Sequence, residues 1–397
     1  MMKSEAFDVA VIGAGPAGLM AAYRASLRGL KVVVFDPNKK QGRKLRITGK
    51  GRCNVCNSCD IQTIMKNISS DGRFLYSSLN RFGPDDVINF FESNGVKLKI
   101  ERGNRVFPQS DNANDIADCM VQLCLNNSVV FERKKIREFS EIKAKAIIIA
   151  TGGCSYPLTG SDGNGYKLAK MLGHTIVDPF ASLVPLESND FFCETLQGFA
   201  PKNVVLKLFE DGKLIYKELG EMLFTHFGVS GPLVLTASSH MRNRYSNYSL
   251  EIDFKPALDE QKLDNRILKV LSENSNKDII NVLSDVIGCS MSPIILSLSN
   301  INPSRKCNAI TKKQRSSIKQ LLKSFPINIT GKRSIDEAII TAGGVLTKEI
   351  DPKTMRSRLK NNYYFAGEIL DVDACTGGFN LQIAWSTGYV AGEEVLK

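Results

Sequence analysis

The chain has 397 residues, a hydrophobic share of 43%, and 52 Lys and Arg against 41 Asp and Glu, which give a net charge of +11. This length and composition suffice for two or three domains with a core, and exclude a disordered protein, a collagen-like fibre and a miniature disulfide scaffold. Residues 24–73 and 302–334 together carry a net charge of +18, and the rest of the chain carries −7. This distribution predicts a local anion site and a solvated helix face, and it disfavours a surface that coats nucleic acid.

The sequence contains no run of 18 apolar residues, so it predicts no membrane span. The first eight residues lack the apolar core of a signal peptide. Ten cysteines are scattered along the chain, which favours free thiols in a reducing compartment. We therefore predict a cytoplasmic protein.

The first forty residues predict a dinucleotide-binding unit. An apolar strand at 7–12 runs into a glycine-rich turn, an Ala-rich helix follows at 19–27, and a second strand at 31–35 ends at Asp36. Glycines at these spacings allow a tight turn, close approach of the backbone to a pyrophosphate, and packing of helix on strand. The acid at the end of the second strand would accept hydrogen bonds from a ribose. The turn residues predicted to hold the pyrophosphate are Gly13, Ala14, Gly15, Pro16, Ala17 and Gly18.

Two later strands also end in small residues. The run at 144–150 ends at Ala150 and leads into Thr151 and Gly152, and the run at 363–365 leads into Gly367 and Glu368. A doubly wound flavin domain needs several such strand ends, because each brings backbone against the cofactor. The fold class is therefore predicted as α/β, with a discontinuous FAD-binding domain at 1–186 and 333–397.

The intervening segment has a different pattern. Short alternating strands are predicted at 203–209, 214–216 and 248–254, with a hairpin turn at Asp211 and Gly212. Amphipathic helices are predicted within 259–287 and at 311–325, the second with Thr311 as its N-cap. We predict a β-rich, barrel-like domain at 187–256 and 303–332, and a small helical domain at 257–302.

Three segments resemble a bacterial flavoprotein family that includes aminoacetone oxidase and the bile-acid-inducible NAD(P)/FAD-dependent oxidoreductases. They are KLRITGKGRCN at 44–54, TGGCSYPLTGSDGNGY at 151–166 with GH and LVPL after it, and the stretch from 343 to 392 that contains YFAGEILDVDACTGGFNLQIAWSTGYVAG. The FTHFGVSGP segment at 224–232 resembles the family too. The resemblance implies non-covalent FAD in a glutathione-reductase-like domain that carries an inserted β-barrel and a small helical domain.

The resemblance also assigns residues to the cofactor. It implies that Asp36 binds the ribose, that Ile136 offers its backbone to the adenine, and that Glu368 accepts from ribityl or pyrophosphate hydroxyls. The further residues implied to lie along the adenosine half or near the flavin are Arg43, Lys44, Arg52, Cys53 and Asn54.

The last glycine pair precedes a helix predicted at 383–396. The N-terminus of this helix would face the N1 and O2 edge of the flavin, where its partial positive charge stabilises the anionic reduced ring. The residues assigned to this turn are Gly378, Phe379, Asn380 and Leu381, and Trp385 and Tyr389 are interpreted as core residues of the helix.

Three cysteines form a CxxCxxC pattern at Cys53, Cys56 and Cys59. Such a pattern can hold an iron–sulfur cluster or zinc, or can form a redox-active dithiol beside the flavin. A cluster lacks a nearby fourth cysteine, zinc lacks a nearby histidine, and the family usually has Thr at position 56. We interpret the three as ordinary thiols, with a flavin-coupled dithiol of Cys53 and Cys56 as the alternative and no metal.

Three residues are candidates for catalysis: His226 as a proton donor, and Cys154 and Cys375 as linings of the substrate pocket. For each, a structural role is the simpler alternative. The basic run at 302–334 is interpreted as the wet face of the helix at 311–325, with a funnel for an anionic substrate as the alternative.

The glycine-rich stretch at 160–165 follows a Pro-containing loop and no strand, so it is not a second dinucleotide fingerprint. Electrons must then come from the substrate itself or from transiently docked NAD(P)H. We predict an FAD-dependent oxidoreductase that moves a hydride between flavin N5 and a small organic substrate. Amine oxidation with O2 as acceptor and NAD(P)H-driven reduction of an enone both stay open. The rivals are a thiol/disulfide oxidoreductase and a non-enzymatic flavoprotein associated with nucleic acid.

Overall fold

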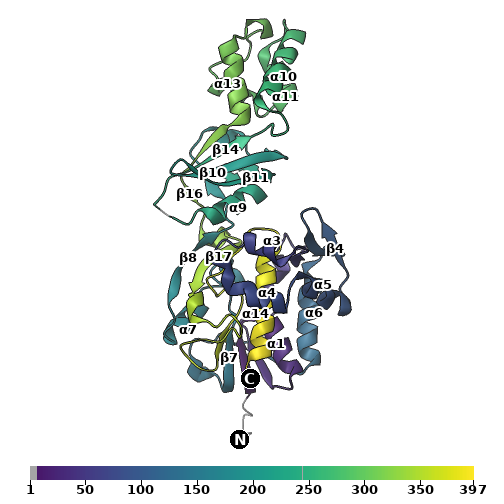
Figure 1. Ribbon diagram of the computed structural model, residues 1–397, viewed down its shortest axis with the longest axis vertical. Helices are drawn as coiled ribbons and strands as arrows, with labels where there is room; N and C mark the ends of the chain where they lie inside the picture. The colour runs from purple at the N-terminus through teal and green to yellow at the C-terminus, as the bar shows by residue number, and fades with distance from the viewer. Residues whose placement is uncertain (1–6, 244) are drawn as a thin grey trace. The chain divides into compact units, whose positions relative to one another are not determined.

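A computed structural model describes residues 7–243 and 245–397, which form two compact units (Figure 1). Unit 1 comprises the described residues up to Ser182 together with Ser334–Lys397, and unit 2 is Leu183–Arg333. The sequence predicts no signal-peptide core in the first eight residues. Residues 1–6 of this stretch lie outside the described residues. Each unit has its own hydrophobic core.

Unit 1 is built on a five-stranded sheet in which all neighbouring strands are parallel. Its inner strands are rich in β-branched residues and largely buried, as expected for a parallel sheet that is covered on both faces. The predicted α/β class with a parallel, Rossmann-like sheet is confirmed. In spatial order the strands are β18 (Tyr363–Phe365), β7 (Ala144–Ile149), β1 (Phe7–Ile12), β2 (Val32–Phe35) and β6 (Val130–Glu132).

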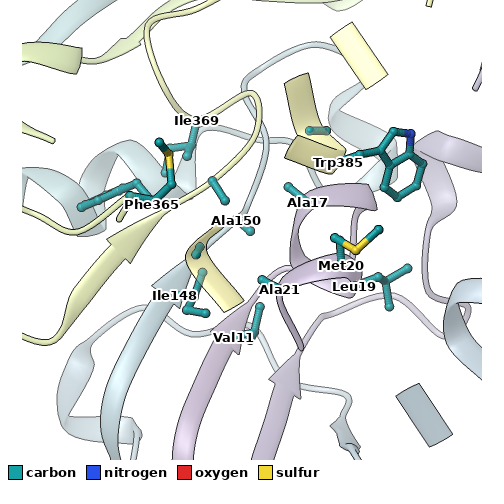
Figure 2. Packing of buried hydrophobic residues seen from close by; sticks show 14 of the residues in the cluster. Val11, Ala17, Leu19, Met20, Ala21, Ile148, Ala150, Phe365, Ile369 and Trp385 are labelled. Carbon is teal, nitrogen blue, oxygen red and sulfur yellow. The ribbon is translucent and has the colours of Figure 1, made fainter. Parts of the chain in front are cut away.

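Two helices of unit 1 pack unusually closely, α1 (Pro16–Leu27) and α14 (Phe379–Glu394) (Figure 1). A Cβ atom added at Gly388 would lie 2.3 Å from the carbonyl oxygen of Ala17, and one at Gly392 would lie 2.4 Å from that of Ala21. The two glycines of α14 therefore let the helix backbones touch. Figure 2 shows Ala17 and Ala21 in the buried cluster that also contains Ile148 of β7.

The remaining elements of unit 1 extend this core. A three-stranded antiparallel sheet has the order β3 (Cys56–Asn57), β5 (Arg105–Pro108), β4 (Leu98–Glu101), and β17 (Ile340–Val345) pairs antiparallel with β8 (Ile176–Ser182). The other helices are α2 (Arg43–Ile47), α3 (Ile61–Lys66), α4 (Tyr76–Arg81), α5 (Pro84–Ser93), α6 (Ala113–Asn126) and α7 (Asn164–Met171).

Unit 2 contains two four-stranded sheets. The first is fully antiparallel, in the order β11 (Lys213–Gly220), β10 (Val204–Glu210), β14 (Tyr248–Asp253), β15 (Phe325–Ile329), and Asp211 and Gly212 form the predicted hairpin turn. The second has the order β12 (Leu223–Thr225), β13 (Gly228–Ser230), β9 (Leu186–Glu187), β16 (Gly331–Lys332). Closure into a barrel stays a prediction.

The helices of unit 2 are α8 (Phe192–Thr195), α9 (Pro232–His240), α10 (Glu260–Glu273), α11 (Ile279–Ile287), α12 (Ser292–Leu298) and α13 (Lys312–Lys323). Their apolar residues join those of the sheets in one cluster. The separate helical domain at 257–302, like the other predicted domain boundaries, therefore stays a prediction. Within the described residues no single helix is long and apolar enough to span a membrane, although α11 and α12, bent by 118°, would pass as a pair by length and composition.

The predicted helix at 311–325 is correct at its start and wrong at its end. Thr311 is the N-cap and forms a capping box with Gln314, but α13 stops at Lys323, and Phe325 begins β15. The reason is Pro326, because a residue before proline avoids the helical conformation. Phe325 is thus buried as a strand residue that pairs with Ile252.

The last helix also differs from its prediction. It begins at Phe379, four residues before the predicted start at 383, and ends at Glu394. Gly378 takes a left-handed conformation with φ of 98° as the N-cap, which turns the chain directly into the helix. The prediction that Trp385 is a core residue is confirmed, because its side chain is fully buried.

Candidate cofactor and active site

The candidate site lies at the carboxyl edge of the parallel sheet in unit 1. Because β1, β2, β7 and β18 run parallel, the residues after them meet at one edge: Gly13, Asp36, Ala150 and Glu368 follow these four strands. The sequence predicted all four as cofactor residues. The topology brings these strand ends to a common edge, and their binding role stays a prediction.

The glycine turn leaves an open space in front of α1. Gly13 has a φ of 104°, and a Cβ there would lie 2.5 Å from the carbonyl oxygen of Ala150, so the turn requires glycine. A Cβ at Gly18 would lie 1.9 Å from the carbonyl oxygen of Gly13. At Gly15, the N-cap of α1, the backbone is extended and a Cβ would meet nothing within 4 Å. The free N–H groups of the helix therefore border unfilled space, as an anion site needs.

Asp36 is fixed against this turn. One carboxylate oxygen accepts from the backbone N–H of Ala14 at 2.8 Å, and the other accepts from the N–H of Asn38 at 2.8 Å. Each oxygen keeps a further lone pair, so the carboxylate can still accept from a ribose diol. Asn38 also donates to the carbonyl oxygen of Thr159 at 2.8 Å, which ties the 155–160 loop to the end of β2.

A polar network surrounds Glu368 at the end of β18. Lys44 donates to its carboxylate at 2.7 Å and to the hydroxyl of Ser155 at 2.7 Å, and Thr341 donates its backbone N–H at 2.9 Å. The side chains of Lys44 and Glu368 are 20% and 17% exposed, so the pair is partly screened from water yet still accessible. Ser155, in the loop after β7, and Thr341, near the start of β17, carry no spacing signal in the sequence that marks them as site residues.

The start of α14 is held by two side chains. The amide nitrogen of Asn380 donates to the carbonyl oxygens of Ala374 at 2.7 Å and Cys375 at 3.3 Å, and its oxygen accepts from the N–H of Ala374 at 2.9 Å. Asn57 of β3 donates to the carbonyl oxygen of Gly377 at 3.0 Å. The loop before the first-turn N–H groups of the helix is thus held by side-chain hydrogen bonds.

The RCN segment lies against this loop. A Cβ at Gly378 would lie 2.4 Å from the carbonyl oxygen of Cys56 and 2.9 Å from the side-chain oxygen of Asn54. That Asn54 oxygen is buried and accepts no hydrogen bond within the described chain. A buried amide oxygen without a donor is costly, so a bound group with an N–H could satisfy it after a small rotation of the side chain.

Other predicted cofactor residues have partners of their own. Arg52 pairs with Asp111 at 2.6 Å and with Glu101, and its guanidinium lies over the ring of Phe107. Arg43 is exposed, 3.4 Å from the side-chain oxygen of Asn38. The carbonyl oxygen of Ile136 accepts from Asn164 at 2.7 Å, so an adenine would have to share it or use the N–H alone.

The three candidates for catalysis fall in different places. Cys154 is half-buried in unit 1, where its N–H donates to the hydroxyl of Thr341 at 2.8 Å, and burial raises the pKa of its thiol. Cys375 is buried beside the start of α14. His226 is exposed in the turn between β12 and β13 of unit 2. Roles for all three stay predictions.

The environments of the three CxxCxxC cysteines disfavour the thiolate form. Burial raises the pKa of Cys53 and Cys56 far above the usual range, and that of Cys59 to about 11. None of the three forms a disulfide. Since the thiolate is the nucleophile in exchange, these environments favour the interpretation as ordinary thiols. Among the described residues no group of three or more His, Cys, Asp and Glu could hold a metal ion.

Replacing Cys56 with Thr, the usual family residue, tests the dithiol alternative. We expect flavin reduction rates within about threefold of the wild type, because a thiol with a raised pKa contributes little thiolate at neutral pH. Cys289→Thr, at an exposed cysteine, is the matched control. Stopped-flow rates that fall about 100-fold in the Cys56 variant alone, about 2.7 kcal/mol of transition-state stabilisation, would instead support the dithiol.

The basic run at 302–334 is largely neutralised within unit 2. Five of its nine Lys and Arg pair with acids from other segments: Lys306 with Asp278, Arg315 with Asp264, Lys319 with Glu260, Lys323 with Asp253 and Arg333 with Glu187. This pairing favours the solvated helix face over an anionic funnel.

Comparisons with known proteins agree over the whole length. A family model described as "HI0933-like protein Rossmann domain" matches residues 7–394. The chain is 28% identical to a 3-dehydro-bile acid delta(4,6)-reductase of Clostridium scindens, over 97% of this chain and 98% of that protein. It is also similar to ribosomal RNA dihydrouridine synthases of Escherichia coli (28% identity, 99% of this chain and 98% of the other) and Haemophilus influenzae (29%, 98% of each).

Proposed function

The chain belongs to the HI0933-like protein family, as the resemblance predicted. On this basis we propose that it is an FAD-dependent reductase of carbon–carbon double bonds that are conjugated to a carbonyl group. One observation of the structure supports FAD as the cofactor. The open N-terminus of α1 and the start of α14 belong to the same unit, and the sheet edge of this unit also holds Asp36 and Glu368. An anion site beside two carboxylates suits a dinucleotide with ribose and ribityl hydroxyls.

The relatives support the reaction class. A delta(4,6)-reductase of a 3-oxo bile acid and a dihydrouridine synthase act on very different molecules, yet both names describe saturation of a double bond that is conjugated to a carbonyl. Both proteins match this chain from end to end. The shared step is therefore a better-supported proposal than either substrate.

Different residues of the chain would bind different parts of the cofactor. FAD would supply hydride transfer at its N5 atom. The N–H groups at the start of α1 bind the pyrophosphate, Asp36 accepts from the adenosine ribose, and the first-turn N–H groups of α14 stabilise negative charge on the ring. The buried oxygen of Asn54 would accept from a ring N–H once its side chain rotates. Cys154 and Cys375 lie in loops that would border the substrate.

We propose transiently docked NAD(P)H as the electron donor. In the described chain the glycine-rich stretch at 160–165 follows the 3₁₀ turn Pro157–Thr159 and no strand, which supports the absence of a second dinucleotide domain. Under anaerobic conditions, NADH or NADPH should bleach the bound flavin within seconds, and aminoacetone should leave it oxidised. Bleaching by the amine and by neither nicotinamide would reverse the assignment and make the protein an amine oxidase.

Replacing Asn380 with Leu tests the role of α14. The variant loses the hydrogen bonds that fix the loop at Ala374 and Cys375, so the N–H groups should bind the reduced ring less well while FAD stays bound. We expect a midpoint potential about 30 mV more negative, equivalent to about 1.4 kcal/mol for two electrons. Spectroelectrochemistry measures it, with Asn89→Leu at an exposed position as control. An unchanged or more positive potential would remove Asn380 from the account.

A second candidate concerns the substrate. Two relatives named as ribosomal RNA dihydrouridine synthases favour a uridine of ribosomal RNA, whereas the sequence predicted a small-molecule substrate and disfavoured nucleic acid. Ribosomal RNA incubated with the protein and NADPH would be digested to nucleosides and analysed by mass spectrometry. A uridine heavier by two hydrogen atoms supports this candidate, and RNA left unchanged while a steroid enone is reduced refutes it.

A further inference from the structure

We infer that Lys44 is a ligand of the cofactor pyrophosphate and that Glu368 and Ser155 are the residues that orient it. The inference deepens the proposed function and rests on FAD as the cofactor. It revises the sequence-based assignment, which placed Lys44 along the adenosine half and gave the acceptor role to Glu368.

Two contacts hold Lys44 next to the glycine turn. The N–H of Gly42, the residue before α2, donates to the carbonyl oxygen of Ala14 at 2.8 Å, which anchors the helix that carries Lys44. On the other side, a Cβ at Gly367 would lie 2.7 Å from the Cβ of Ala17, so the Gly367–Glu368 segment abuts the first turn of α1. The ion pair between Lys44 and Glu368 therefore lies beside the open end of α1.

The hydrogen bonds of Lys44 leave one donor for a ligand. Its ammonium lies 2.7 Å and 3.1 Å from the two oxygens of the Glu368 carboxylate, and 2.7 Å from the Ser155 hydroxyl. Two oxygens of one carboxylate subtend much less than the tetrahedral angle, so a single N–H serves both. An ammonium has three N–H groups, and within the described residues the third makes no hydrogen bond. The ammonium also lies 5.9 Å from the centre of the Tyr156 ring, and the side chain is 20% exposed.

The charges at the site explain why a pyrophosphate would need this donor. A pyrophosphate brings two negative charges into a site that already contains Asp36 and Glu368, and the first turn of α1 supplies only partial charges. Glu368 already accepts from several groups, because Lys44 donates to both of its oxygens, and Ser155 and the N–H of Thr341 donate to Oε1. Glu368 therefore acts as a positioning residue that holds the Lys44 ammonium, whose remaining N–H would face the pyrophosphate.

Riboflavin, which has the flavin ring and no phosphate, separates this role from a general effect on the fold. Apoprotein would be titrated with FAD and with riboflavin while flavin fluorescence is followed. For Lys44→Met we expect FAD affinity to fall about 10- to 100-fold, the size of one hydrogen bond to a charged group, and riboflavin affinity to change less than threefold. Lys40→Met removes an exposed lysine nearby and should change neither.

Loss of the cation could destabilise the protein by leaving Glu368 unpaired. The double variant Lys44→Met/Glu368→Gln leaves no unpaired charge and should show the same loss of preference for FAD over riboflavin. The wild-type preference for FAD should weaken with added salt, and that of both variants should respond less. Equal losses for FAD and riboflavin, or no loss, would overturn the inference while FAD binding by the wild type upholds the proposed function. A wild type that binds neither flavin would overturn both.

Discussion

Gly15→Val should give a folded, colourless protein. The position has φ of −79° and ψ of −177°, an extended backbone that valine readily adopts, and an added Cβ meets no protein atom within 4 Å. The side chain would instead occupy the space in front of α1 that we assign to the pyrophosphate. We expect FAD affinity to fall at least about 100-fold, about 2.8 kcal/mol. The ratio of flavin to protein absorbance measures it.

The fold should be almost unaffected in this variant. Valine is a poorer N-cap than glycine by about 1 kcal/mol, so circular dichroism should be unchanged and the thermal midpoint only slightly lower than that of the wild-type apoprotein. Normal FAD content in the folded variant would show that the cofactor does not lie at this turn.

Gly388→Val should have the opposite outcome, loss of the folded protein. A Cβ at Gly388 would lie 2.3 Å from the backbone oxygen of Ala17, and backbone cannot move aside as a flexible side chain can. The two helices would have to separate and so open the core that Trp385 and Met20 share (Figure 2). We expect a destabilisation of about 3 kcal/mol or more, a large share of the 5–15 kcal/mol of a typical domain.

The same substitution at Gly15 is the matched control, since both variants add identical atoms to a glycine beside α1. Chemical unfolding of the two apoproteins measures the difference in the free energy of unfolding. A Gly388 variant as stable as the Gly15 variant would mean that α14 can shift along α1 without cost, and that their close packing is not what holds the site together.

Local patterns in the sequence predicted the parallel sheet edge well. The strand runs before Gly13 and Asp36 are short, apolar and β-branched, and the glycine spacing has one stereochemical explanation. Both features act over a few residues, so they can be read without tertiary information. The start of α14 was missed because a Gly-Gly pair is typical of a loop, whereas Gly378 serves as a left-handed N-cap.

The contacts that tune the site could not be predicted in the same way. Lys44 meets Glu368 across 324 residues of chain, and Ser155 meets Glu368 across 213, so no spacing rule connects them. The burial that raises the pKa of Cys53 and Cys56 likewise comes from packing that the CxxCxxC pattern does not encode. Amino-acid composition likewise does not show which acids pair with the basic run at 302–334.

The proposed reaction is tested most directly by the rate at which reduced protein is reoxidised under anaerobic conditions. Photoreduced holoprotein would be mixed with an α,β-unsaturated ketone, with its saturated analogue, and with buffer, and the return of flavin absorbance would be followed by stopped flow. Our account predicts rapid reoxidation by the unsaturated ketone, with one double bond lost per flavin, and none by the saturated analogue or buffer. Reduced flavin that persists with the unsaturated ketone and with uridine-containing ribosomal RNA, yet is reoxidised at once by O2, would contradict it.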